Sequence, residues 1–126
     1  MGVRQPADIS EMFGTYFNKR DKSALLTLYT DTALLTVDGT IVARGKVEID
    51  RMVTPFFESP LKIAIKCVTC HQQGDTALVR SDWKLTGPDG AVAMAGSSAE
   101  VLRKGADGLW RFIFDDATFA SRPSVI

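Results

Sequence analysis

Apolar residues recur every three or four positions in the first third of the chain, which is the spacing of amphipathic helices. In residues 7–21 they form one stripe, which consists of Ile9, Met12, Phe13, Tyr16 and Phe17. A second, short helix that carries Leu25, Leu28 and Tyr29 is expected after Asp21, whose side chain can cap it, and a third helix is expected after Gly45. Pro55 removes a backbone donor and should kink or end the third helix. The sequence "VDG" between the last two helices predicts the turn of a hairpin.

From Pro60 onward the apolar period changes to two, which is the period of strands. The turn sequences "QQGD", "GPDG" and "KGADG" separate four expected strands, at about 61–73, 76–86, 91–104 and 108–118. Consecutive hairpins would join these strands into an antiparallel meander. Helices followed by such a sheet define an α+β protein.

Composition narrows the classes of partner. The 126 residues are 45% hydrophobic and 24% charged, which suits a single domain with one core over residues 1–126. The 15 basic and 15 acidic residues cancel, so no broad positive field attracts nucleic acid or an anionic membrane. The first ten residues lack the apolar run of a secretory signal, and no later run is long enough to span a bilayer. We therefore expect a cytoplasmic protein with neither a nucleic-acid nor a membrane partner.

Residues 67–71 read Cys-Val-Thr-Cys-His, the letters of a c-type haem attachment site. Side chains alternate between the faces of a strand, so Cys67 and Cys70 are expected on opposite sides of the sheet. That geometry argues against covalent haem and against a redox dithiol, and two cysteines with one histidine fall short of a structural zinc site. We expect free thiols, an exposed His71, no metal and no cofactor.

The hairpin centred on Pro88 and Asp89 predicts which face of the sheet is buried. In this register Trp83 pairs with Met94, and Ala77 pairs with Glu100. The face that they share is mostly apolar and should meet the helices, whereas Arg80, Asp82, Lys84, Ser97 and Arg103 fall on the other face. Glu100, together with Ser98 and Ser81, is thus expected to point inward. An inward carboxylate is costly unless it is neutralised, paired or in contact with water.

The last hairpin admits two registers because Gly105 and Gly108 permit loops of different length. If Lys104 pairs with Leu109, then Glu100 faces Ile113, Ser98 faces Asp115, and Arg111 lies diagonal to Glu100 on the inward face. A shift of one residue would instead bury Trp110, Phe112 and Phe114 and expel the charges. We favour the first register. It leaves two interpretations of its charges: an acidic pocket, or a buried pair of Glu100 with Arg111 that fixes the register.

The order of these elements resembles a known superfamily. The sequences "LYTDTALL", "VDG", "ARG" and "DGLWR", in this order, are similar to those of the nuclear-transport-factor-two-like superfamily, and most of all to its SnoaL-like and ketosteroid-isomerase-like bacterial proteins. The likeness covers residues 7–118. It implies a cone-shaped α+β fold in which three N-terminal helices pack on a strongly curved, mainly antiparallel sheet. Such scaffolds host isomerases, cyclases, hydrolases and binding modules.

The resemblance can be carried over residue by residue to the isomerase site. Phe13 stands where that enzyme has its helix-one tyrosine, and Thr36 stands where it has its aspartate base. Glu100 falls at the position of the protonated aspartate of the oxyanion hole, while Ile113 and Asp115 fall on the pocket wall. Steroid isomerase activity is therefore not expected, although an acidic pocket is.

Two functions follow as hypotheses. One is a proton-transfer enzyme of the isomerase, cyclase or dehydratase type that acts on a small apolar carbonyl compound, with Glu100 or Asp115 as the catalytic acid. The other is a non-catalytic ligand-binding or protein-association domain on the same scaffold. The remaining residues expected to line the pocket are Tyr16, Trp83, Met94, Ser98, Arg111 and Ile113.

The favoured register also predicts an assembly. It places Trp110, Phe112 and Phe114 in a row on the outer face of the sheet. So large an apolar patch is rarely left exposed in a monomer. A homodimer packed through this face would cover it, as in many members of the superfamily that the chain resembles.

Overall fold

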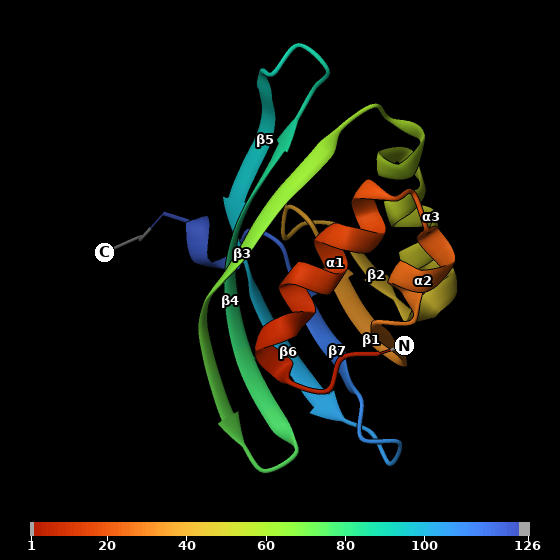
Figure 1. Cartoon of the computed structure of the whole chain (residues 1–126), viewed down its shortest axis with the longest axis vertical. Helices are drawn as coiled ribbons and strands as arrows, with labels where there is room; N and C mark the ends of the chain where they lie inside the picture. Colours follow the sequence, from red (N-terminus) through yellow and green to blue (C-terminus); the bar gives the residue numbers. More distant parts are fainter. Residues whose placement is uncertain (1, 124–126) are drawn as a thin grey trace.

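The computed structural model describes residues 2–123, in which three helices pack on one curved sheet (Figure 1). The α-helices are α1 (Ile9–Asn18), α2 (Lys22–Leu26) and α3 (Gly45–Glu58), and two short 3₁₀ turns are η1 (Pro6–Asp8) and η2 (Phe119–Ser121). The strands are β1 (Tyr29–Thr36), β2 (Val42–Arg44), β3 (Lys62–Gln73), β4 (Thr76–Thr86), β5 (Val92–Ser97), β6 (Ala99–Lys104) and β7 (Trp110–Asp116). The expected α+β class is confirmed.

Local sequence explains the limits of the helices. The Asp21 side chain accepts a hydrogen bond from the backbone N–H of Ala24, which caps α2 as expected. Helix α2 ends at Leu26, so Tyr29 opens β1 and is not part of the helix. Helix α3 continues to Glu58, beyond Pro55, so of the two expected effects of this proline, a kink or an end, the end does not occur.

The strands follow the order β2-β1-β7-β6-β4-β3, with β5 paired to the upper part of β4. All the pairings are antiparallel except that of β1 with β7. Helix α1 crosses the concave face of the sheet, and the long β3–β4 hairpin bends around it (Figure 1).

The pairing of β4 differs from the predicted register by two residues. Val79 pairs with Glu100 and Trp83 with Gly96, because the turn is one residue longer than predicted, with Thr86 opposite Val92, and a bulge after Leu85 adds a second residue. A shift of two residues keeps every side chain on its face. The expected inward position of Glu100 is therefore confirmed, although its partner is not the predicted one.

Strand β7 contains one extra residue, and neither predicted register describes it. Leu102 pairs with Phe112 while Val101 pairs with Phe114, so Ile113 is an inserted bulge residue. Before the bulge, Trp110 and Phe112 point into the core and are 2% and 3% exposed. After it, alternation resumes with Asp115 inward. The favoured register therefore gives the wrong face for the residues before Ile113, and the alternative register gives the wrong face for the residues after it.

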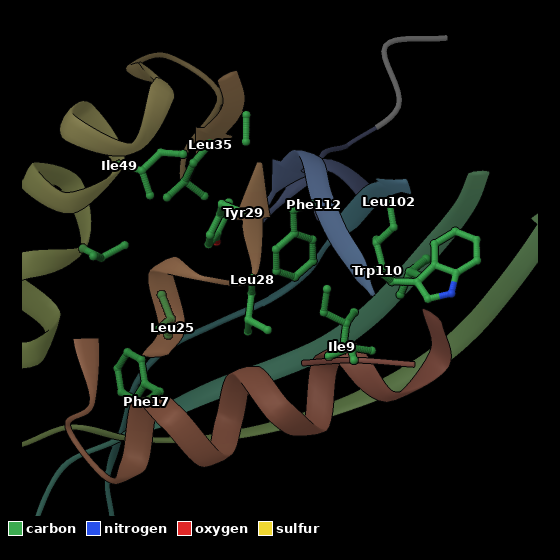
Figure 2. Close-up of a cluster of buried hydrophobic side chains, with 14 of the residues drawn as sticks. Ile9, Phe17, Leu25, Leu28, Tyr29, Leu35, Ile49, Leu102, Trp110 and Phe112 are labelled. Carbon is green, nitrogen blue, oxygen red and sulfur yellow. The ribbon is translucent and has the colours of Figure 1, made fainter. Parts of the chain in front are cut away.

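The burial of Trp110 and Phe112 also corrects the predicted outer face. Both rings lie among the core side chains drawn in Figure 2, beside Leu102 and Ile9. Only Phe114, which is 50% exposed, lies on the outer face. The three-aromatic patch from which the homodimer was inferred does not exist.

A second bulge corrects the prediction for the cysteines. Cys67 pairs with Ser81 and Cys70 with Val79, because the register of β3 shifts at Val68. Both cysteines therefore lie on the inward face, not on opposite faces, and both pack against the core as free thiols. None of the helices in residues 2–123 combines the length and apolar composition that a bilayer span requires.

Candidate functional site

A cavity of about 90 Å³ lies between the helices and the concave face of the sheet. Most of its wall is apolar. The wall includes aromatic side chains from α1, from α3 and from the strands, namely Phe13, Phe17, Tyr29, Phe56, Phe57, Trp83 and Phe112. The Trp83 indole N–H donates to the backbone carbonyl of Ala117 at 2.7 Å, which fixes the ring across one side. Such a wall suits an apolar ligand.

Two carboxyl groups form the polar end of the cavity. Glu100 on β6 and Asp115 on β7 are directly paired across the strands, and both line the cavity. They are 4% and 6% exposed, and their carboxyl groups share a hydrogen bond. The Tyr29 hydroxyl donates to Oδ2 of Asp115 at 2.5 Å. We call Glu100 and Asp115 the acid pair.

Burial controls the protonation of the acid pair. Desolvation raises the pKa of Asp115 to about 6, against the lowering effect of the hydrogen bonds from Tyr29 and Glu100. Desolvation and then the nearby Asp115 charge raise the pKa of Glu100 well above its ordinary value. The hydrogen bond between the two carboxyl groups requires one shared proton, and the raised pKa of Glu100 favours Glu100 as the group that holds it. A proton donor and a proton acceptor consequently lie side by side in an apolar cavity.

Three serines surround the acid pair. The hydroxyls of Ser10 and Ser81 are 2.6 Å apart and bond to each other. The Ser98 hydroxyl accepts from the Ser81 N–H at 3.1 Å and lies 3.2 Å from the Ser81 carbonyl oxygen. Ser98 also forms a hydrogen bond with Glu100 that lowers the pKa of this carboxyl, although less than burial raises it. These serines join α1, β4 and the acid pair.

The structure brings five of the eight predicted site residues together. The five residues in the cavity wall are Trp83, Met94, Ser98, Glu100 and Asp115. Tyr16, Arg111 and Ile113 lie outside it: Ile113 is the bulge residue of β7, and Tyr16 and Arg111 line a separate surface depression. The predicted pairing of Arg111 with Glu100 was wrong, because the Arg111 guanidinium binds Asp107 at 2.7 Å.

Tyr29 is the side chain of the candidate site that sequence reasoning missed. Its ring packs 4.9 Å from that of Phe112, and its hydroxyl reaches an acid 86 positions away in the chain. The sequence places Tyr29 at the end of the apolar spacing of the second helix, where a core role suffices. Of the positions matched to the isomerase, Phe13 lines the cavity, whereas the Thr36 hydroxyl accepts from the Gly39 N–H in a turn.

Comparison with known proteins defines the class. The chain matches the SnoaL-like domain over residues 9–113, so it belongs to the SnoaL-like family. This confirms the superfamily that the sequence resembles. No curated protein matches the chain.

Solved structures share the fold. A ketosteroid isomerase-like protein from Erwinia carotovora atroseptica is 27% identical, with 89% of this chain and 94% of that one covered and a TM-score of 0.68. An NTF2-like protein with a cystatin-like fold from Novosphingobium aromaticivorans is 18% identical, with coverages of 87% and 76% and a TM-score of 0.76. A protein named for the calcium/calmodulin-dependent protein kinase type II association domain, from Thiobacillus denitrificans, is 19% identical, with coverages of 92% and 95% and a TM-score of 0.78. The last two likenesses show the fold alone.

Proposed function

We propose that the protein binds a small apolar carbonyl compound in its cavity and that the acid pair transfers protons to and from this ligand. The observation that carries the proposal is the direct pairing of Glu100 with Asp115 at the buried end of an apolar cavity. Family membership supports it, because the SnoaL-like and ketosteroid isomerase-like scaffold suits a small-molecule-binding or isomerase-type role.

The two acids would divide the work of a tautomerisation. Asp115, which is ionised above about pH 6, would take a proton from the carbon next to the carbonyl group. Glu100 would give its proton to the carbonyl oxygen, which forms an enol and leaves the pair again with one proton. Return of a proton to a different carbon would complete an isomerisation. Tyr29 would act as a positioning residue, because its hydroxyl holds Asp115 in place.

Deuterium exchange tests this chemistry directly. Cyclic ketones would be incubated with the protein in D₂O, and loss of the protons next to the carbonyl would be followed by NMR. We expect the wild type to accelerate exchange and Asp115→Asn to reduce that acceleration by about 100-fold or more. Glu58→Gln, at an exposed position on α3, is the matched control and should exchange like the wild type.

The outcomes separate the two functions. Exchange that persists in Asp115→Asn would contradict the assignment of the base. Binding of the ketones without any exchange would favour the non-catalytic alternative, which the absence of the isomerase residues at Phe13 and Thr36 also supports.

We also propose a homodimer, now through a different patch. Leu78, Val101 and Phe114 are cross-strand neighbours on the outer face, and Leu78 and Phe114 are 49% and 50% exposed. An apolar row of this kind is best covered by a second copy of the same face. Sedimentation at micromolar concentration should show a dimer that Phe114→Glu converts to a monomer. A monomeric wild type would contradict this proposal and leave the cavity proposal untouched.

A further inference from the structure

The polar groups around the cavity show what kind of atom a ligand must bring. The Tyr29 hydroxyl donates to Asp115, the Trp83 N–H donates to Ala117, and the Ser10 and Ser81 hydroxyls bond each other. The Ser98 hydroxyl lies between the Ser81 carbonyl and Glu100. Tyr29, Trp83 and Ser98 thus donate to acceptors within the protein, whereas the bond between Ser10 and Ser81 uses the proton of only one of these two hydroxyls.

One acceptor is left over. Glu100 Oε1 is fully buried and has no hydrogen-bond partner among residues 2–123, although the other groups of the acid pair are bonded. A buried acceptor without a donor destabilises a protein by about 1–3 kcal/mol, so such atoms are rare and call for an explanation. Glu100 lines the cavity, so a ligand held there can supply the missing donor.

We propose that the ligand of this cavity carries a hydroxyl group on a small apolar frame, as an alcohol, a phenol or an enol, and that this hydroxyl donates to Oε1 of Glu100. The inference rests on the proposed binding function and deepens it, because it names the chemical class of the ligand.

The same set of donors and acceptors disfavours two other classes of ligand. A ketone brings only an acceptor, so it would leave Oε1 of Glu100 without a donor, whichever hydroxyl of the cavity donated to the ketone oxygen. An ammonium group brings three donors to one free acceptor, and its hydration would be lost against an apolar wall. A single neutral hydroxyl matches a single free acceptor.

This preference also fits the proposed reaction. The enol of a carbonyl compound is a hydroxyl compound, so the cavity is complementary to the intermediate and not to the ketone. An enzyme accelerates a reaction through interactions that are stronger in the transition state than in the ground state. Stable alcohols and phenols of the same shape should then act as inhibitors.

A matched pair of probes tests the inference. Cyclohexanol and cyclohexanone share a ring and differ in whether the oxygen donates, and their dissociation constants would be measured by NMR titration at pH 7. We expect wild-type protein to bind cyclohexanol about tenfold more tightly. Glu100→Met removes the free acceptor and should reduce this ratio to about one.

A second variant guards against misfolding of the first. Glu100→Gln can donate its amide N–H to Asp115 and still present its carbonyl oxygen to the ligand, so it should keep the preference for cyclohexanol. Glu58→Gln should leave both affinities unchanged. Loss of the preference in Glu100→Gln would contradict the assignment of the free acceptor.

Three results would overturn the inference. Equal affinity for the two probes, or tighter binding of cyclohexanone, would refute the hydroxyl while the cavity remained a binding site. Tighter binding of cyclohexylammonium than of cyclohexanol would indicate that the ligand carries a cation and not a neutral hydroxyl. Failure of all three probes to bind the folded protein would refute the proposed binding function and this inference with it.

Discussion

The β6–β7 hairpin carries two carboxylate sites that behave in opposite ways. At its turn, the exposed Asp107 binds Arg111 at 2.7 Å, and hydrogen bonds from Arg111 and from the Leu109 N–H lower the pKa of Asp107 to about 2. Further along β7, burial raises the pKa of Asp115 to about 6, and its hydrogen-bond partners are the Tyr29 hydroxyl and a second carboxyl group, that of Glu100. Arg111 is separated from Asp115 by three residues, one of which is the bulge residue Ile113.

The difference teaches that the surroundings of a carboxyl group decide its role more than its place in the sequence does. At Asp107 the charge is paired and solvated, so the ionised form is favoured and the site suits only surface structure. At the acid pair burial penalises the ionised forms, so a proton is retained to a higher pH than at an exposed carboxyl group. Retained protons are what acid–base chemistry requires.

Stability as a function of pH should show the largest contrast. The unfolded chain ionises Asp115 near its ordinary pKa of 3.8, whereas the folded chain does so near 6, so folding is favoured at low pH and this stability is lost as pH rises through that window. Glu100 acts in the same direction. We expect the pair to remove roughly 3 kcal/mol or more between pH 4 and pH 8.

Denaturant unfolding of Glu100→Gln/Asp115→Asn measures this contribution. The double variant should lose that pH dependence and become more stable than the wild type at pH 8. Asp107→Asn is the matched control, because the lowered pKa of Asp107 favours folding above its ordinary value of 3.8 and this benefit is lost only as pH falls towards 2. If the wild type instead became more stable between pH 5 and pH 8, and the double variant did not, the acid pair would not be buried as described.

Tyr29→Phe should have the next largest effect. It removes the hydrogen bond to Asp115 Oδ2 and is expected to reduce the free energy of unfolding by about 1–2 kcal/mol. The pKa of Asp115 should rise above 6, because that bond favours the ionised form. Carboxyl NMR titration reports the shift, with Asp107 as an internal control that should not move. An unchanged Asp115 titration would mean that the hydroxyl does not bond to it in solution.

Arg111→Met should alter only the exposed site. The pKa of Asp107 should rise from about 2 towards the ordinary range, since the first cause of its depression is the Arg111 hydrogen bond. The titration of Asp115 should stay the same in the same NMR experiment. A change in the pKa of Asp115 in Arg111→Met would indicate that Arg111 points inward, towards the acid pair.

The smallest expected effect is the coupling between the two sites. A double-mutant cycle of Glu100→Gln with Arg111→Met should be additive within about 0.5 kcal/mol, because the two side chains share no partner. Strong coupling between the two substitutions would mean that Glu100 and Arg111 interact, which the bulge at Ile113 prevents.

Much of the fold could be predicted from periodicity and turn residues. The three helices, the long strands and the inward face of β4 follow from them, since Trp83, Leu85 and Val79 alternate with polar residues. The inward position of Glu100 followed as well. These features depend on local alternation, which a sequence displays directly.

The remaining features depend on single inserted residues. Nothing in the sequence marks Val68 or Ile113 as bulges, because both are apolar, β-branched residues suited to a strand. Each insertion changes the face of everything beyond it, which explains the errors at Cys70 and Arg111. Tyr29 was missed for another reason, namely that its partner is brought to it only by the parallel pairing of β1 with β7.

The bulge at Ile113 also has a consequence for comparing sequence lengths within the family. If Ile113 were absent, Phe112 and Phe114 would be adjacent in a regular strand, with Phe112 still in the core and Asp115 still in the cavity. A relative with an unbulged strand should therefore be one residue shorter here while it keeps the same buried residues. A sequence alignment should place that gap inside β7, at Ile113, and not in the loop that precedes the strand.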